Sequence, residues 1–257
     1  MNNFDFEDIG ALHEKIDNPN PQEEVNISNV WHEMGHVIGN LICNKLGYNF
    51  GEIIEIHLMG VNGSKVRYKD LFFHVEGVMT CNISILDFYG YPNCIYIESS
   101  HEEELREKVQ KNIKDFFTYQ IQLYLGGVFN IYYLNQKPDF KYFKECYTDY
   151  ESTSLQNIEG RAGNDWTKSR KCLGYIKADL SKVTDFRNEL FYILERYDIF
   201  ESFRNLIEKI SERFNGKIID KAGLKEVLSE AQKILDAVDG HFFDQLSKHI
   251  DEYLTKI

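Results

Sequence analysis

Proline and paired cysteines are scarce in this chain of 257 residues. Only four prolines occur, so packed helices are favoured over loops that proline interrupts repeatedly. The cysteines are odd in number and include no C-x-x-C pair: Cys43, Cys81, Cys94, Cys146 and Cys172. That pattern is typical of reduced thiols in an intracellular protein and does not indicate a disulfide framework.

An excess of basic charge and a long apolar run are also missing. Acidic residues outnumber basic ones by 41 to 29, which gives a formal net charge of −12 and argues against a nucleic-acid partner. No uninterrupted apolar run approaches the roughly 18 to 20 residues that span a bilayer. The first residues, MNNFDFEDIGALHEK, lack the apolar centre of a signal peptide. We therefore expect a cytoplasmic protein without membrane insertion.

The remaining composition is that of an ordinary globular protein, 43% hydrophobic and 27% charged, in a chain long enough to bury a full core. The pattern along the chain favours a mainly α (α+β) fold, in which a small β-sheet is inserted after the first long helix. We expect an N-terminal arm over residues 1–25, in which DNPNPQEE breaks regular structure, and a single domain over residues 26–257.

The expected elements follow from hydrophobic periodicity and turn residues. A helix is predicted from about Asn26 or Ser28 to Leu46, with Gly47 as its stop. Strands are predicted at about 52–82, where the Asn-Gly pair at positions 62–63 indicates a hairpin between EIIEIHLMGV and SKVRYKD, and LFFHVEGVMTCNI could add a third strand. A long helix is expected after residue 100. Three or four C-terminal helices are expected over about 165–257, where the spacing of His241 and His249 suggests a solvated helix face.

The stretch NVWHEMGHVIGN carries the strongest chemical signal in the sequence. His32 and His36 are four residues apart, so on a helix both imidazoles can face one Zn²⁺ ion. Glu33 lies about 100° around the helix and could serve as general base toward a water molecule on the metal. Gly35 and Gly39, one turn apart, would let another backbone approach closely. The competing interpretation is an ordinary helix with two histidines of no special role.

A catalytic zinc needs a third protein ligand, and the motif helix does not supply it. The extended pattern H-x-x-G-x-x-H fails, because Ile42 stands where the histidine is required. Asp165, in RAGNDWTKSRKCLGYI, is a candidate far along the chain. An aspartate at a helix start is also explained simply as a cap. Glu151 and Glu159 are further candidates, and the residues alone do not decide among the three.

Several segments in order resemble a known family. HEMGH is followed by β-hairpin material, then LYLGGVFNIYYL, then AGNDWTKSRKCLGYI. This order is similar to the peptidase domain of the FtsH-type AAA metalloproteases, which has HEAGH, a small sheet, a helix with L-Y-G-G-R, and a G-A-x-x-D segment that opens the next helix. The resemblance covers roughly residues 26–235 and is strongest at the first motif.

The resemblance implies a ligand set and an activity. It makes His32, His36 and Asp165 the zinc ligands and Glu33 the catalytic base of a metalloendopeptidase that hydrolyses peptide bonds in proteins or unfolded polypeptides. The chain has neither a Walker A loop nor a transmembrane segment, so the implied form is a stand-alone peptidase without its own ATPase. Its expected partners are a polypeptide substrate and, beyond that, further copies of itself or a separate unfoldase.

Two rival hypotheses belong to other classes. A non-proteolytic metal-binding adaptor or substrate-binding module, derived from such a peptidase, would keep the ligands and lack the reaction. A purely structural helical protein would carry the motif by coincidence and bind no metal. Cleavage assays and metal analysis distinguish the three hypotheses.

Overall fold

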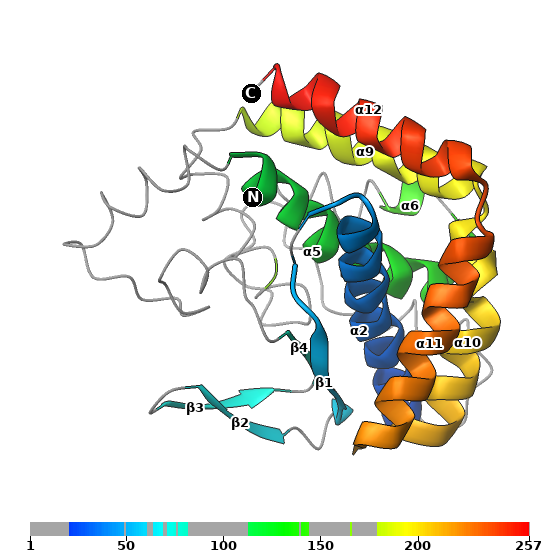
Figure 1. Ribbon diagram of the computed structural model, residues 1–257. Coiled ribbons are helices and arrows are strands. Elements are labelled where there is room, and N and C mark those ends of the chain that lie inside the picture. The colour runs from blue at the N-terminus through cyan, green and yellow to red at the C-terminus, as the bar shows by residue number, and fades with distance from the viewer. Residues whose placement is uncertain are drawn as a thin grey trace, which may run out of the picture.

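The computed structural model describes residues 21–48, 50–60, 64–68, 71–75, 77–81, 113–138, 140–143, 165 and 179–256. The described part is mainly helical with a small antiparallel sheet, as predicted for a mainly α (α+β) fold. Helices α2 (Pro21–Lys45) and α5 (Ile113–Asn135) pack against each other at its centre, and strands lie on one side of α2 (Figure 1). The site discussed below lies where α2 and α5 meet.

Helix α2 begins earlier than the sequence predicts. It starts at Pro21 instead of Asn26 or Ser28, so the prediction of an irregular arm up to residue 25 is wrong for residues 21–25. Proline is well tolerated at the first helical position, because the N–H that it lacks has no partner there. The other end is close to the prediction: α2 ends at Lys45, and Gly47 adopts the left-handed φ of 89° that stops helices. Residues 1–20 lie outside the described part.

Four of the five described strands fall within residues 52–82 as expected, but their pairing differs. Strand β1 (Ile53–Leu58) lies between β4 (Gly77–Cys81) and the short β5 (Lys217–Ile218), antiparallel to both. The predicted hairpin between the first two strands is therefore wrong, and residues 62–63 lie outside the described residues. Strand β2 (Ser64–Tyr68) pairs instead with β3 (Leu71–Val75), and this ribbon projects to one side (Figure 1).

The local β2–β3 pairing has a simple physical reason. Only two residues separate Tyr68 from Leu71, so closing this hairpin costs little chain entropy. Strand β1 is free to pair elsewhere, and its buried apolar residues Ile53, Ile56 and Leu58 form part of the core. The stretch predicted as one third strand is thus divided into β3 and β4.

The C-terminal region is helical, as predicted. Helices α9 (Leu180–Arg196), α10 (Ile199–Phe214), α11 (Lys221–Ala237) and α12 (Gly240–Leu254) follow one another, and α9 and α12 lie side by side (Figure 1). A one-turn helix, α6 (Phe140–Phe143), follows α5 along the chain.

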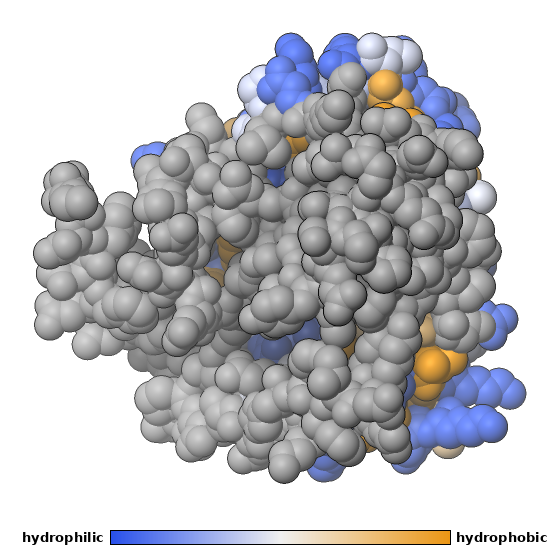
Figure 2. Space-filling model, turned by 90° about the vertical axis from the view of Figure 1, so that its left-hand side faces the viewer, coloured by the Kyte–Doolittle hydropathy of each residue, from blue (hydrophilic) through white to orange (hydrophobic). Residues whose placement is uncertain are grey.

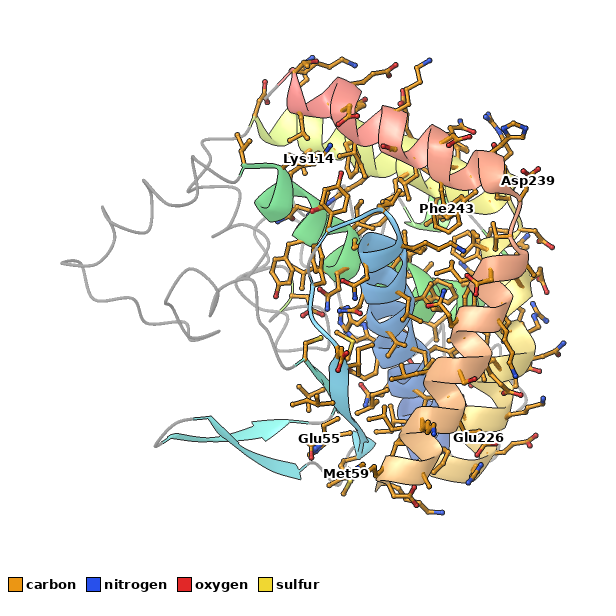
Figure 3. All side chains as sticks on the ribbon, in the orientation of Figure 1. Glu55, Met59, Lys114, Glu226, Asp239 and Phe243 are labelled. Atoms are coloured by element: carbon orange, nitrogen blue, oxygen red, sulfur yellow. The ribbon has the colours of Figure 1, made fainter. Side chains whose placement is uncertain are left out.

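Aspartate side chains cap three of these C-terminal helices. Asp179, Asp220 and Asp239 accept hydrogen bonds from backbone N–H groups of the first turns of α9, α11 and α12, at 2.7 to 2.9 Å. Asp239 stands at the junction of α11 and α12 (Figure 3). The suggestion of a solvated face for His249 is wrong: its ring is buried and stacks on Phe186 with centroids 4.6 Å apart.

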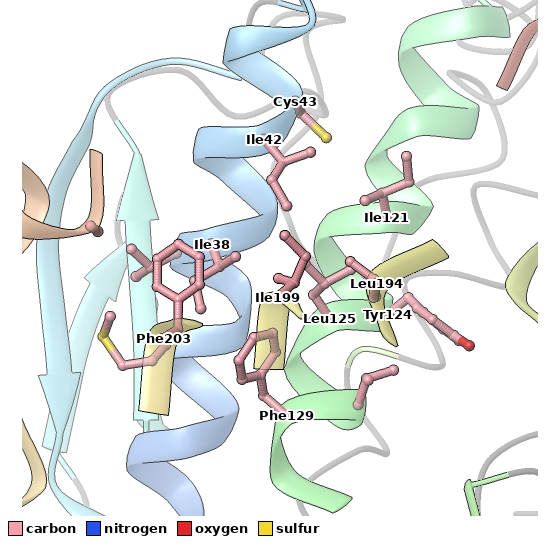
Figure 4. Packing of buried hydrophobic residues seen from close by; sticks show 14 of the residues in the cluster. Ile38, Ile42, Cys43, Ile121, Tyr124, Leu125, Phe129, Leu194, Ile199 and Phe203 are labelled. Carbon is pink, nitrogen blue, oxygen red and sulfur yellow. The ribbon is translucent and has the colours of Figure 1, made fainter. Parts of the chain in front are cut away.

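The core is built around the α2–α5 pair and closed by α9 and α10. Figure 4 shows Ile38 and Ile42 of α2 facing Leu125 and Phe129 of α5, with Phe203 of α10 beside them. All five side chains are essentially inaccessible to solvent. Burial of this apolar surface stabilises the helix pair by about 25 cal/mol per Å², and so fixes the surroundings of the motif residues.

No helix among the described residues is long and apolar enough to cross a membrane. On the face drawn in Figure 2, the described residues at the surface are mostly hydrophilic, with small apolar areas between them.

Candidate metal centre

Three of the residues singled out in the sequence come together in space. The Oδ2 atom of Asp165 lies 2.9 Å from His32 Nε2 and 3.0 Å from His36 Nε2, and the two Nε2 atoms are 3.1 Å apart. All three side chains are buried. They form the one group of histidine, cysteine and carboxylate ligands in the described part of the chain that could hold a metal ion. Glu151 and Glu159 lie outside the described residues.

The arrangement fits a small divalent cation. Ligand atoms of a tetrahedral zinc ion, each about 2.0 to 2.1 Å from the metal, lie roughly 3.3 Å from one another. The three atoms here form a triangle with sides of 2.9, 3.0 and 3.1 Å, close to that spacing. Two imidazole nitrogens and one carboxylate oxygen are also a ligand set common at zinc. The donors therefore match zinc in type and in spacing.

A backbone carbonyl orients His36. Its Nδ1 donates a hydrogen bond to Gln122 O of α5 at 2.9 Å, which leaves Nε2 facing Asp165. A partner on the second ring nitrogen is the usual way in which proteins fix a metal-binding histidine. Residue 122 carries no side-chain signal for this role, because the acceptor belongs to the backbone. Sequence reasoning therefore could not find it.

His32 Nε2, His36 Nε2 and Asp165 Oδ2 can each accept a hydrogen bond or bind a cation. Three such atoms lie this close together only if a positive charge or a shared proton sits between them. Burial alone would lower the pKa of His36, but the Asp165 carboxylate beside it, with help from Glu33 and Gln122 O, raises that pKa to about 9. His32 Nδ1 is buried, and no hydrogen-bond partner for it is present in the described part of the chain. A metal cation would take the place of the proton that His36 otherwise holds between the rings and the carboxylate.

Glycines allow the two central helices to approach at this point. A Cβ atom on Gly35 would lie 2.3 Å from Leu125 O, and one on Gly39 would lie 2.8 Å from the Cα of Gln122. A Cβ atom on Gly126 would lie 2.3 Å from Cε1 of His36. These contacts explain why α2 accepts glycines that cost about 1 kcal/mol each in a helix. The close backbone approach predicted at Gly35 and Gly39 is confirmed, and α5 supplies that backbone.

Glu33 lies on the side of α2 that faces the sheet. Its side chain is 5% exposed, and a Cβ atom on Gly77, the first residue of β4, would lie 2.6 Å from Glu33 Oε1. The carboxylate is near enough to His36 to help raise the pKa of that imidazole. Glu33 therefore stands between the three-residue cluster and the start of strand β4. Neither Gly77 nor the neighbouring Asn29 was singled out by the sequence.

Comparison with protein families, with curated proteins and with solved structures found no match for this chain. The resemblance to the FtsH-type peptidases therefore rests on the motifs and their order along the chain.

Proposed function

We propose that this chain is a zinc-dependent metalloendopeptidase that cleaves proteins or unfolded polypeptides without an ATPase of its own. The observation that carries the proposal is the buried triangle formed by His32, His36 and Asp165. Glu33 directly follows His32 on helix α2. Two histidines and an aspartate would hold the ion and leave a coordination position for water or substrate.

Zinc, when bound there, would polarise the scissile carbonyl and lower the pKa of a bound water toward roughly 7. In this proposal Glu33 takes a proton from the attacking water and passes it to the leaving amine. Its burial keeps bulk water away from the carboxylate, so the proton stays within the site. The Gln122 carbonyl holds His36 in the tautomer that presents Nε2 to the metal.

A polypeptide substrate could add as a strand to the outer edge of β4. Among the described strands, β4 pairs only with β1, and it begins at Gly77 beside Glu33. Strand addition binds the peptide through its backbone and so tolerates many sequences, which suits an endopeptidase acting on unfolded chains. A peptide-bound structure with the substrate away from this edge would refute the binding mode and leave the zinc chemistry untouched.

The test compares wild type with Glu33→Gln for zinc content and for cleavage of casein or an unfolded peptide. The variant should bind zinc as wild type does and lose cleavage by about 10²- to 10⁴-fold, because only the general base is removed. Full zinc binding with no cleavage by wild type would favour the adaptor or substrate-binding module. Less than about a tenth of an equivalent of zinc, after purification without chelators, would favour a structural helical protein.

A further inference from the structure

A second pair of buried polar residues on α2 faces the start of strand β4. Asn29 and Glu33 are one helical turn apart, so their side chains lie on the same face. Asn29 is 4% exposed and Glu33 is 5% exposed. A buried asparagine inside a helix is unfavourable by propensity and by desolvation, so its position calls for a specific role.

Both side chains converge on Gly77. A Cβ atom built on this glycine would lie 2.6 Å from Glu33 Oε1, 2.7 Å from Glu33 Cγ and 2.7 Å from Asn29 Nδ2. The carboxylate and the amide are therefore within 2.7 Å of the same point in space. Any side chain at position 77 would occupy that point and would have to push one of the two groups away.

Backbone and side-chain contacts hold strand β4 in place at both of its ends. Gly77 is opposite Leu58 in the β1–β4 register, and Leu58 O also accepts a hydrogen bond of 2.8 Å from Gly216 N near β5. At the other end of β4, Cys81 Sγ accepts a hydrogen bond of 3.3 Å from Asn40 Nδ2 of α2. The backbone against which Glu33 rests therefore cannot easily move away from α2.

We infer that Asn29 and Gly77 are positioning residues for Glu33: the glycine leaves room for the carboxylate, and the asparagine amide bounds the space beside residue 77 that the carboxylate faces. The inference rests on the proposed function, in which Glu33 is the general base. A base must be held in the productive orientation, since a displacement of about 1 Å can cost roughly 10²-fold in rate. In this account neither residue touches the metal, and neither offers a side chain to the substrate.

The experiment measures zinc content, kcat and KM for Asn29→Ala, Gly77→Ala and the double variant Asn29→Ala/Glu33→Gln. Each single variant should keep its zinc and its KM within about twofold and lose kcat by roughly 10²-fold. Because Asn29 acts through Glu33, adding Asn29→Ala to Glu33→Gln should cause no further loss. An additive loss in the double variant, or an unchanged kcat in both single variants, would overturn the inference.

Two control variants separate positioning from folding. Ser28 directly precedes Asn29, and its buried hydroxyl contacts Asn130 of α5. Ser28→Ala removes this hydroxyl and should lower thermal stability without changing kcat. Gly240→Ala adds a Cβ atom where nothing lies within 4 Å, and should change neither property much.

An inactive wild type would contradict the proposed function but would not decide whether Asn29 and Gly77 position Glu33. Crystal structures of the variants test the positioning role in either case. The Glu33 carboxylate should leave its position beside residue 77 in Asn29→Ala and in Gly77→Ala. An unchanged Glu33 rotamer in both structures would contradict the positioning role.

Discussion

His36 Nε2 lies 3.0 Å from Asp165 Oδ2, although 129 positions separate the two residues in sequence. Only the fold brings them together, since α2 carries the histidine and the aspartate comes after α5 and α6. Neither group would remain buried with its charge uncompensated. The contact belongs to a group that could hold a metal ion, and the predictions below follow from the proposal that it binds zinc.

Asp165→Asn should abolish tight zinc binding. The variant keeps the shape of the side chain and removes the charge that makes the oxygen a good ligand, so we expect zinc affinity to fall by at least about a hundredfold. Competition with a chromophoric chelator measures the affinity. Asp251→Asn is the matched control, because Asp251 is an exposed aspartate paired with Lys114 at 2.7 Å, and its loss should leave zinc binding unchanged. Equal affinity in wild type and Asp165→Asn would exclude Asp165 as a ligand.

Zinc binding should release one proton at neutral pH. The pKa of His36 is raised to about 9, so its Nε2 is protonated at pH 7 in the metal-free protein and must lose that proton to bind a metal. Apparent affinity should rise about tenfold per pH unit between roughly pH 7 and 9, and level off above. Calorimetry in two buffers of different protonation enthalpy measures the proton directly. No proton release at pH 7.5 would show that His36 is not one of the zinc ligands.

The same raised pKa predicts how the metal-free fold responds to pH. A histidine whose pKa is higher in the folded than in the unfolded state stabilises the fold fully below the unfolded value, near 6.5. This contribution should be lost as the pH rises through about 9. Denaturant titrations of chelator-treated protein across this range should show the fall, and His36→Gln should lack it.

Gly35→Ala and Gly126→Ala should both lower stability, and only Gly126→Ala should also weaken zinc binding. The added methyl group on Gly35 meets backbone of α5, so this variant should lose about 1 to 3 kcal/mol or more of unfolding free energy, measured by denaturant titration. The methyl group on Gly126 meets the His36 ring, so this variant should also lose zinc affinity. Gly240→Ala is again the matched control for both. Wild-type stability in Gly35→Ala would mean that α2 and α5 are not in close contact.

The helix that carries His32 and His36 could be predicted from sequence because its signals are local. The four-residue spacing of His32 and His36, the apolar stripe and the stop at Gly47 all act within a few residues of one another. The early start at Pro21 was missed because proline is compatible both with a turn and with a first helical position.

Long-range features were predictable only in part. Strand β5, which completes the sheet beside β1, comes from residues 217–218, too short a segment to give a periodic signal. Asp165 could be named as a candidate, but taken alone it was better explained as a helix cap until its distance to the two imidazoles was known. The hydrogen bond from His36 to the Gln122 carbonyl could not be predicted from the sequence, because every residue has a backbone carbonyl.

X-ray anomalous scattering at the zinc absorption edge, from crystals of protein purified without chelators, tests the central claim most directly. The account predicts one peak per chain, within about 2.0 to 2.2 Å of His32 Nε2, His36 Nε2 and an Asp165 carboxylate oxygen. A peak bound by the two histidines with the Asp165 side chain turned away, or no peak between the two rings, would contradict it.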